Sequence, residues 1–160
     1  MTHIIPKRVV IDTNVCLDLF VFKDPRWSVL LSALQNGEIQ AVTRNDCREE
    51  WLAVLKYPHL PVIPEELEQI TGWYDAYIPC VIPAEPSTYK LPVCSDKDDQ
   101  KFLEIARDAQ AQVLITKDKA LLKLARKMKN AGMFQIQTPE QFLLGYVKEC
   151  DKTASHITKA

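Results

Sequence analysis

Short apolar runs alternate with amphipathic stretches along most of this chain. The runs are rich in Val and Ile and have the length of strands. Between them, apolar residues recur at intervals of three and four, which predicts helices with one buried face. The predicted strands cover residues 8–12, 39–42, 113–116 and 134–137, and the predicted helices cover residues 14–22, 25–36, 46–56, 64–77, 100–109, 118–130 and 139–148. This alternation predicts an α/β fold, an α/β/α sandwich with a central, mostly parallel, Rossmann-like sheet.

One stretch breaks the alternation. Residues 79–98 contain four prolines. Because proline removes a backbone donor and biases the preceding residue away from helix, we expect a surface loop there, with an extended piece at residues 80–82. At 160 residues and 47% hydrophobic, the chain can build one real core. We therefore expect a single domain over residues 1–150 and a polar, frayed tail over residues 151–160.

Charge and cysteine content exclude several protein classes. The formal net charge is -1, so the chain lacks the strong positive field of a non-specific nucleic-acid coat, and any nucleic acid would be bound locally. The five cysteines have no close spacing, which predicts buried free thiols. No apolar run approaches membrane-spanning length, and residues 1–7 lack the apolar core of a signal peptide. We expect a cytoplasmic protein without membrane contact.

Four carboxylates stand out by their positions. Asp12 ends the first predicted strand, and Asp118 follows the third. Glu50 and Asp99 lie in line with the apolar faces of their helices. In open α/β sheets, ligands bind at the carboxyl ends of the strands, where acids from separate segments can converge. Since Mg²⁺ and Mn²⁺ favour oxygen ligands, the four acids predict a shared metal site suited to phosphodiester chemistry.

Each acid also has an explanation that needs no metal. Asp12 and Asp118 can cap helices. Glu50 can form a salt bridge with a lysine or arginine at the edge of the core. The acidic run at residues 96–99 is of a kind that is usually just solvated. The coincidence of four such positions favours the metal site, and we expect one of the crowded carboxyls to have a raised pKa until metal binds.

Other catalytic chemistries have less support. The three histidines, His3, His59 and His156, lie near the N-terminus, after a helix and in the tail, where no nucleophile and base pair is evident. A Gly-rich loop for nucleotide phosphates is missing from the sequence. A phosphatase of the haloacid-dehalogenase type wants a second aspartate two residues after Asp12, where this chain has Asn14.

Four segments in this order and spacing resemble the PIN-domain ribonucleases, and within them the bacterial branch described as toxins of toxin–antitoxin systems. These segments are residues 10–15, 50–55, 94–103 and 115–122, and the resemblance covers about residues 8–148. It implies that the catalytic and metal-binding acids are Asp12, Glu50, Asp99 and Asp118, with Asn14 and Thr116 in supporting polar positions. Trp51, Ser95 and Lys117 depart from the family pattern, and Lys117 places a bulky cation beside the site.

The resemblance also implies an activity and partners. One or two Mg²⁺ or Mn²⁺ ions would activate water to hydrolyse single-stranded RNA, leaving 5′-phosphate and 3′-hydroxyl ends. The implied partners are the RNA substrate, an antitoxin protein and further copies of the chain in a homo-oligomer. Apart from the resemblance, cationic side chains share one face of the helix predicted after Asp118, opposite its leucines. Each of them alone is more typical of a solvated helix surface, but as a cluster beside the site they would bind phosphates. They are Lys119, Lys123, Arg126 and Lys127.

A function of a different class stays open at this point. The chain would then be a non-catalytic module with the same PIN fold, and its acidic cleft would dock a basic protein partner. The two functions differ in metal binding, which only the nuclease requires.

Overall fold

The predicted α/β architecture is confirmed. The computed structural model describes residues 7–83, 85 and 87–158. A central sheet contains β1 (Lys7–Ile11), β2 (Ile39–Ala41), β3 (Val113–Ile115) and β4 (Gln135–Gln137). The strand order is β2-β1-β3-β4, and all neighbouring strands are parallel. Beyond β2, an isolated parallel bridge joins Thr43 to Cys80, where the sequence predicts an extended piece.

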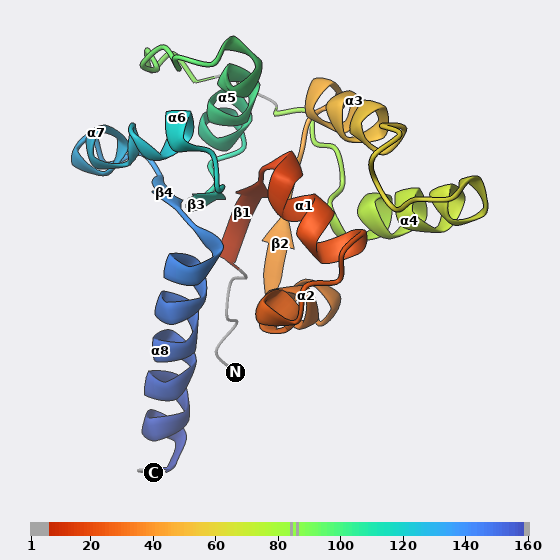
Figure 1. The fold of residues 1–160 in the computed structure, drawn as a ribbon. Coiled ribbons are helices and arrows are strands. Elements are labelled where there is room, and N and C mark those ends of the chain that lie inside the picture. Colours follow the sequence, from red (N-terminus) through yellow and green to blue (C-terminus); the bar gives the residue numbers. More distant parts are fainter. Residues whose placement is uncertain (1–6, 84, 86, 159–160) are drawn as a thin grey trace.

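Helices connect the strands and cover both faces of the sheet (Figure 1). They are α1 (Thr13–Phe20), α2 (Ser28–Gln35), α3 (Asn45–Val54), α4 (Pro64–Tyr77), α5 (Gln100–Asp108), α6 (Lys119–Leu122), α7 (Ala125–Asn130) and α8 (Pro139–Thr158), with single 3₁₀ turns η1 (Pro25–Trp27) and η2 (Lys97–Asp99). Each parallel crossover contains at least one helix, as parallel pairing requires.

The sheet divides the interior into two cores. Side chains alternate across a strand, so Val9 and Ile11 pack into one core while Val10 packs into the other. The first core includes residues of α1, α2, α4 and the start of α8, and the second includes residues of α5, α6 and α7. Strands covered on both faces read as continuous apolar runs, which explains why β1 and β3 were recognisable in the sequence.

The single helix predicted over residues 118–130 is wrong. The structure has two short helices, α6 and α7, and the backbone N–H of Leu124 donates to Leu121 O, which closes a turn tighter than an α-helical one. Leu121 and Met128 are fully buried, as predicted, whereas Leu122 and Ala125 are only half-buried. The break means that the cationic residues of this segment do not share one helix face.

The last helix is longer than predicted. We expected it to end near Lys148, but α8 continues to Thr158 because no proline or glycine follows Gly145 to interrupt it. Its start is capped as predicted, since Thr138 Oγ1 accepts from Gln141 N at 3.1 Å and Gln141 Oε1 accepts from Thr138 N at 3.0 Å. No helix in the described part of the chain has the length and hydropathy to cross a bilayer.

The cysteines are all free thiols, but the prediction that they are buried is only partly right. Cys16, Cys47 and Cys94 are buried, whereas Cys80 and Cys150 are exposed. Cys80 lies at the outer side of the sheet beside β2, and Cys150 lies on α8, where it lines a groove with residues of α2.

Candidate metal centre and active site

The candidate site lies where the two central strands end. Asp12 directly follows β1, and its backbone N–H donates to Ile115 O at 2.9 Å in the neighbouring strand β3. Its side chain is buried and accepts a 2.7 Å hydrogen bond at Oδ2 from Thr116 Oγ1. Asp12 occupies the N-cap position of α1, but its side chain forms no capping hydrogen bond. Helix capping therefore does not explain this acid.

Asp118 is tied to Asp12 through Thr116. The Thr116 hydroxyl accepts from Asp118 N at 2.9 Å while it donates to Asp12. The side chain of Asp118 caps α6, because its Oδ1 accepts from Ala120 N at 2.8 Å. One threonine, fully buried, thus fixes two of the predicted acids relative to each other.

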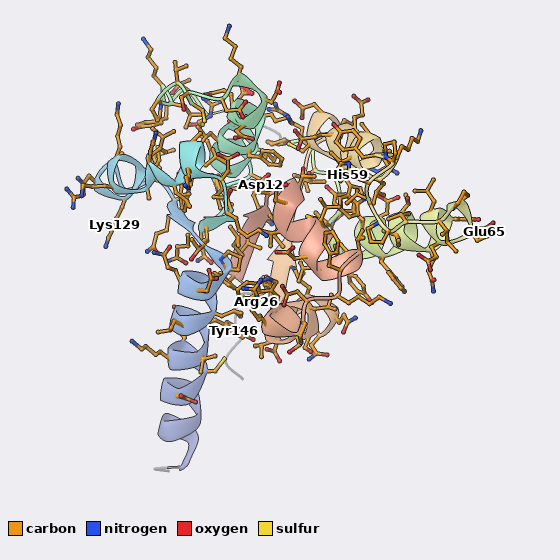
Figure 2. All side chains as sticks on the ribbon, viewed as in Figure 1. Asp12, Arg26, His59, Glu65, Lys129 and Tyr146 are labelled. Carbon is orange, nitrogen blue, oxygen red and sulfur yellow. The ribbon has the colours of Figure 1, made fainter. Side chains whose placement is uncertain are left out.

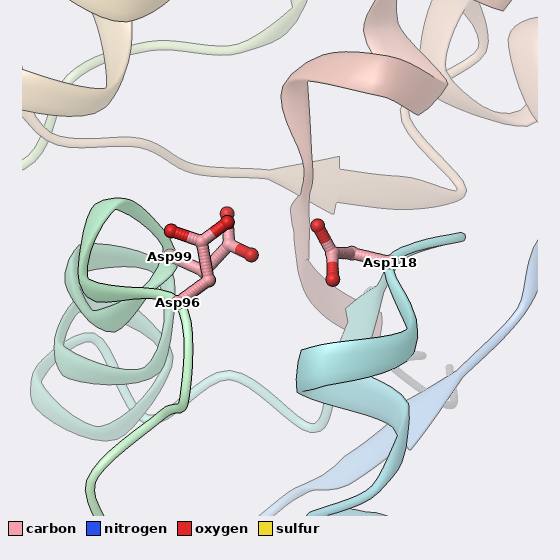
Figure 3. A group of neighbouring side chains, drawn as sticks. All are labelled: Asp96, Asp99 and Asp118. Carbon is pink, nitrogen blue, oxygen red and sulfur yellow. The ribbon is translucent and has the colours of Figure 1, made fainter.

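Three carboxylates form a close cluster at this end of the sheet. Asp96, Asp99 and Asp118 can each place one carboxylate oxygen within 4.8 Å of the others. Figure 3 shows Asp96 and Asp99, from the turn that leads into α5, facing Asp118 at the start of α6. We call these residues the three-carboxylate group. Asp99 is buried in it, and its Oδ2 accepts no hydrogen bond from any described residue.

Burial and crowding alter the acidity of the site. Burial, a side-chain hydrogen bond with Asp118 and the charges of Asp12, Asp118 and Asp96 raise the pKa of Asp99 to about 8. Burial also raises the pKa of Asp12 to about 6, with smaller contributions from the charges of Glu50 and Asp118, although the hydrogen bond from Thr116 opposes this rise. The predicted rise in carboxyl pKa is therefore found at two residues.

Glu50 lies near Asp12 and has a cationic partner. Its Oε1 accepts from Lys101 Nζ at 2.9 Å, and its Oε2 accepts from Thr13 Oγ1. Lys101 also donates to the backbone carbonyl of Asp98. This ion pair is the metal-free alternative considered for Glu50 in the sequence, and the charge of Glu50 contributes a little to the raised pKa of Asp12.

The remaining predicted residues lie around the site with different roles. Asn14 is exposed, and no hydrogen bond described for the site involves it, whereas its neighbour Thr13 binds Glu50. The Lys117 ammonium binds Asp18 Oδ2 at 2.7 Å. The cationic residues of α6, α7 and their junction are all exposed to solvent: Lys119, Lys123, Arg126 and Lys127.

Sequence reasoning missed Asp96 and Lys101. In the sequence Asp96 belongs to an acidic run of the solvated kind, and its side chain is indeed exposed and caps η2 by accepting a 3.0 Å hydrogen bond from Asp98 N. The spacing of Asp96 and Asp99 could have indicated their proximity. In a 3₁₀ turn, residues three apart lie on the same side, and residues 97–99 form such a turn. Lys101 was not singled out because an exposed-looking lysine after an acidic run is an ordinary helix residue.

The residues present fit a divalent cation. A buried carboxylate oxygen without a hydrogen bond is costly unless a charge compensates it, and Asp99 Oδ2 is such an atom. Three carboxylates that supply only oxygen atoms suit a hard ion such as Mg²⁺ or Mn²⁺. Asp12 follows β1, and its charge contributes to the raised pKa of Asp99. These four aspartates would hold the ion.

Comparison with known proteins agrees with this geometry. Residues 8–120 match the model of the PIN domain, which covers the chain from β1 to α6 and includes all the acids of the site. An uncharacterised protein of Methanocaldococcus jannaschii is 26% identical over 145 residues, which cover 88% of this chain and 92% of the archaeal protein. An aspartate–tRNA(Asp/Asn) ligase of Bradyrhizobium sp. (strain ORS 278) is 29% identical over 102 residues, 58% of this chain but only 17% of the ligase. The match of the PIN domain model to most of the chain shows that this protein belongs to the PIN domain family.

Proposed function

We propose that the chain is a metal-dependent endoribonuclease that hydrolyses phosphodiester bonds of single-stranded RNA. PIN domains are generally metal-dependent nucleases that bind RNA. The observation that carries the proposal is the buried Oδ2 of Asp99, which accepts no hydrogen bond from the described residues and lies within the three-carboxylate group. A small cation is the natural complement of that atom, because the exposed fraction of Asp99 is only 7%.

The chain's own residues would prepare the site in distinct ways. Asp12, Asp99 and Asp118 would hold the ion, with Asp96 at its exposed side. Thr116 keeps Asp12 and Asp118 in register through its hydroxyl. Glu50 is paired with Lys101 and would stay outside the ligand set, where it acts on Asp12 only through a small electrostatic effect. When bound, the ion would supply activated water and neutralise charge on the scissile phosphate.

The exposed cations after Asp118 would supply phosphate contacts. Lys119, Lys123, Arg126 and Lys127 belong to two short helices that follow the site directly in the chain. Phosphate contacts of this kind position a nucleic acid without reading its sequence. Because the net charge is -1, such contacts would have to be local.

Cleavage of a labelled single-stranded RNA tests the proposal. The purified protein is assayed with Mn²⁺, Mg²⁺ or EDTA, beside an Asp99→Asn variant that keeps the shape and removes the charge. Asp75→Asn is the matched control, since Asp75 binds Arg48 on the surface between α3 and α4. We expect metal-dependent cutting by the wild type and the control, with 5′-phosphate ends, and none by Asp99→Asn. Equal cutting by all three proteins in EDTA would contradict the proposal.

A docking module for a basic protein is a weaker fit to the same acids. A lysine or arginine from a partner could reach Asp96, which is exposed, but the unpartnered oxygen of Asp99 is buried. Calorimetry with Mg²⁺ separates the two functions. Absence of metal binding would favour docking.

A toxin role follows from the resemblance to the bacterial branch of the family. It predicts that expression of the chain arrests bacterial growth through RNA cleavage. Growth arrest by the wild type, relieved by Asp99→Asn and unaffected by Asp75→Asn, would support this role, and it would also provide an assay for an antitoxin. Equal growth with all three proteins would contradict it.

A further inference from the structure

A polar groove runs along the outer strand of the sheet, outside the carboxylate site. It has a volume of about 440 Å³ and lies between α7, β4 and the first turn of α8. β4 is at the end of the strand order and pairs with β3. The polar residues that line the groove are Arg126, Lys129, Asn130, Gln135, Gln137 and Gln141.

The chemistry of this lining complements a polyanion with hydrogen-bonding bases. Arg126 and Lys129 are exposed, and no carboxylate occurs among the described residues that line the groove. The other polar side chains are amides, which both donate and accept. Gln137 Nε2 donates to Gln135 Oε1 at 2.7 Å, so these two amides form an ordered pair along the strand. Cations that bind phosphates beside amides that bind base edges are the usual elements of single-stranded RNA recognition.

The groove is connected to the carboxylate site through the backbone. Thr116 N donates to Gln137 O at 2.9 Å, and the hydroxyl of the same threonine holds Asp12. All four strands are parallel, so the end of β4 at Gln137 lies at the same edge of the sheet as the site. Figure 2 shows Lys129 at the outer side of α7 and Asp12 at the centre of the molecule. An RNA strand bound at the carboxylates would meet the groove one strand farther out.

We propose that this groove holds the single-stranded RNA on one side of the scissile phosphate. Arg126 and Lys129 contact backbone phosphates, and the amides of Gln135 and Gln137 contact bases or ribose hydroxyls. The inference rests on the proposed nuclease function and deepens it. It also changes the surface expected from the sequence, because Lys123 and Lys127 do not line the groove.

The test measures RNA binding by fluorescence anisotropy across a salt series. The probe is a labelled single-stranded RNA of about 12 nucleotides, and every protein carries Asp99→Asn so that the probe is not cut. Arg126→Gln/Lys129→Gln is compared with Lys56→Gln/Lys148→Gln, which removes two exposed charges elsewhere. We expect the groove variant to bind about tenfold or more weakly, with a salt slope smaller by about 1.4, and the control pair to bind as its parent.

Two further measurements keep the test decisive. RNA containing 4-thiouridine should crosslink to residues 125–141 in the unsubstituted groove, which requires no variant to fold. In contrast, equal salt slopes for the two pairs, or a loss of slope only in Lys123→Gln/Lys127→Gln, would overturn the inference. Binding of a polyglutamate peptide but not of RNA would also overturn it and identify an acidic protein segment as the occupant. Failure of the nuclease proposal is separate, since it is read from cleavage by protein with Asp99 intact.

Discussion

Two buried aspartates, Asp18 and Asp99, differ in the partners of their carboxylates. Asp18 on α1 is 9% exposed, and its Oδ2 accepts from Lys117 Nζ at 2.7 Å and from Trp27 Nε1 at 3.3 Å. Asp99 before α5 is 7% exposed, and its Oδ2 accepts from no described residue. The fold provides a cation for one buried carboxylate and none for the other.

Two lysines are close to the site in the sequence but bind carboxylates outside the three-carboxylate group. Lys117 immediately precedes Asp118, yet its ammonium binds Asp18. Lys101 is two residues after Asp99, yet its ammonium binds Glu50. Both nearby cations therefore neutralise acids outside the three-carboxylate group, and no ion pair among the described residues involves Asp96, Asp99 or Asp118. Three close carboxyls without a cation of their own suit an ion supplied from solution.

Neutralising Asp99 should have the largest effect of all these changes. Asp99→Asn should lower metal-dependent RNA cleavage by about a thousandfold or more, because metal ions contribute several kcal/mol to such reactions. Asp18→Asn should leave the metal dependence of cleavage in place. Steady-state cleavage at saturating Mn²⁺ checks both. A similar loss in the two variants would mean that Asp99 has no special relation to the metal.

The stability of the metal-free protein should fall as pH rises. Its folded state keeps protons on Asp12 up to a pKa of about 6 and on Asp99 up to a pKa of about 8, whereas the unfolded chain releases them near the ordinary value of 3.8. For each extra proton that the folded state holds relative to the unfolded chain, the free energy of unfolding decreases by up to about 1.4 kcal/mol per pH unit. Urea unfolding in EDTA at about pH 5 and about pH 8 measures the fall.

Mg²⁺ should counteract that fall, since the ion binds the deprotonated carboxylates. At a free concentration of about 100 times Kd it should add about 2.7 kcal/mol to the free energy of unfolding. In Asp99→Asn, Mg²⁺ should no longer raise the free energy of unfolding, and that free energy should no longer decrease between about pH 6 and about pH 8. A wild type whose unfolding is insensitive to both pH and metal would contradict the account.

Thr116 tests whether the two acids it joins must be held in register. Thr116→Val keeps the shape but removes the hydroxyl that donates to Asp12 and accepts from Asp118 N. We expect a loss of about 10- to 100-fold in metal affinity or cleavage, the usual range for residues that orient metal ligands. Thr116→Ser should restore most of it. If serine fails as valine does, the methyl group rather than the hydroxyl is what matters.

Substitution of Asp18, which is paired with Lys117, should have the smallest effect. Asp18→Asn should reduce the free energy of unfolding by about 1–2 kcal/mol, because it weakens charged hydrogen bonds from Lys117 and Trp27. Metal affinity should stay as in the wild type. Chemical unfolding with and without Mg²⁺ measures both quantities. A gain in stability would show that the Asp18 pair is not the stabilising contact described here.

The fold and the cluster were predictable to different degrees. β1 and β3 are short apolar runs buried on both faces, so their positions and the acids that follow them could be read directly. The break between α6 and α7 could not be, because Leu124 and its neighbours keep helical spacing and only tertiary packing sets the turn. The sequence also could not predict which carboxylates Lys101 and Lys117 bind, because their partners Glu50 and Asp18 are distant in the chain and become neighbours only in the fold.

Manganese binding to three proteins tests the central claim most directly. Isothermal calorimetry at about pH 8 would compare the wild type, Asp99→Asn and Asp18→Asn, each verified as folded by circular dichroism. The account predicts that the wild type and Asp18→Asn bind the ion equally well, whereas Asp99→Asn binds at least about tenfold more weakly. Equal affinity in all three proteins, or binding in none, would contradict the claim that the missing partner of Asp99 is a metal ion.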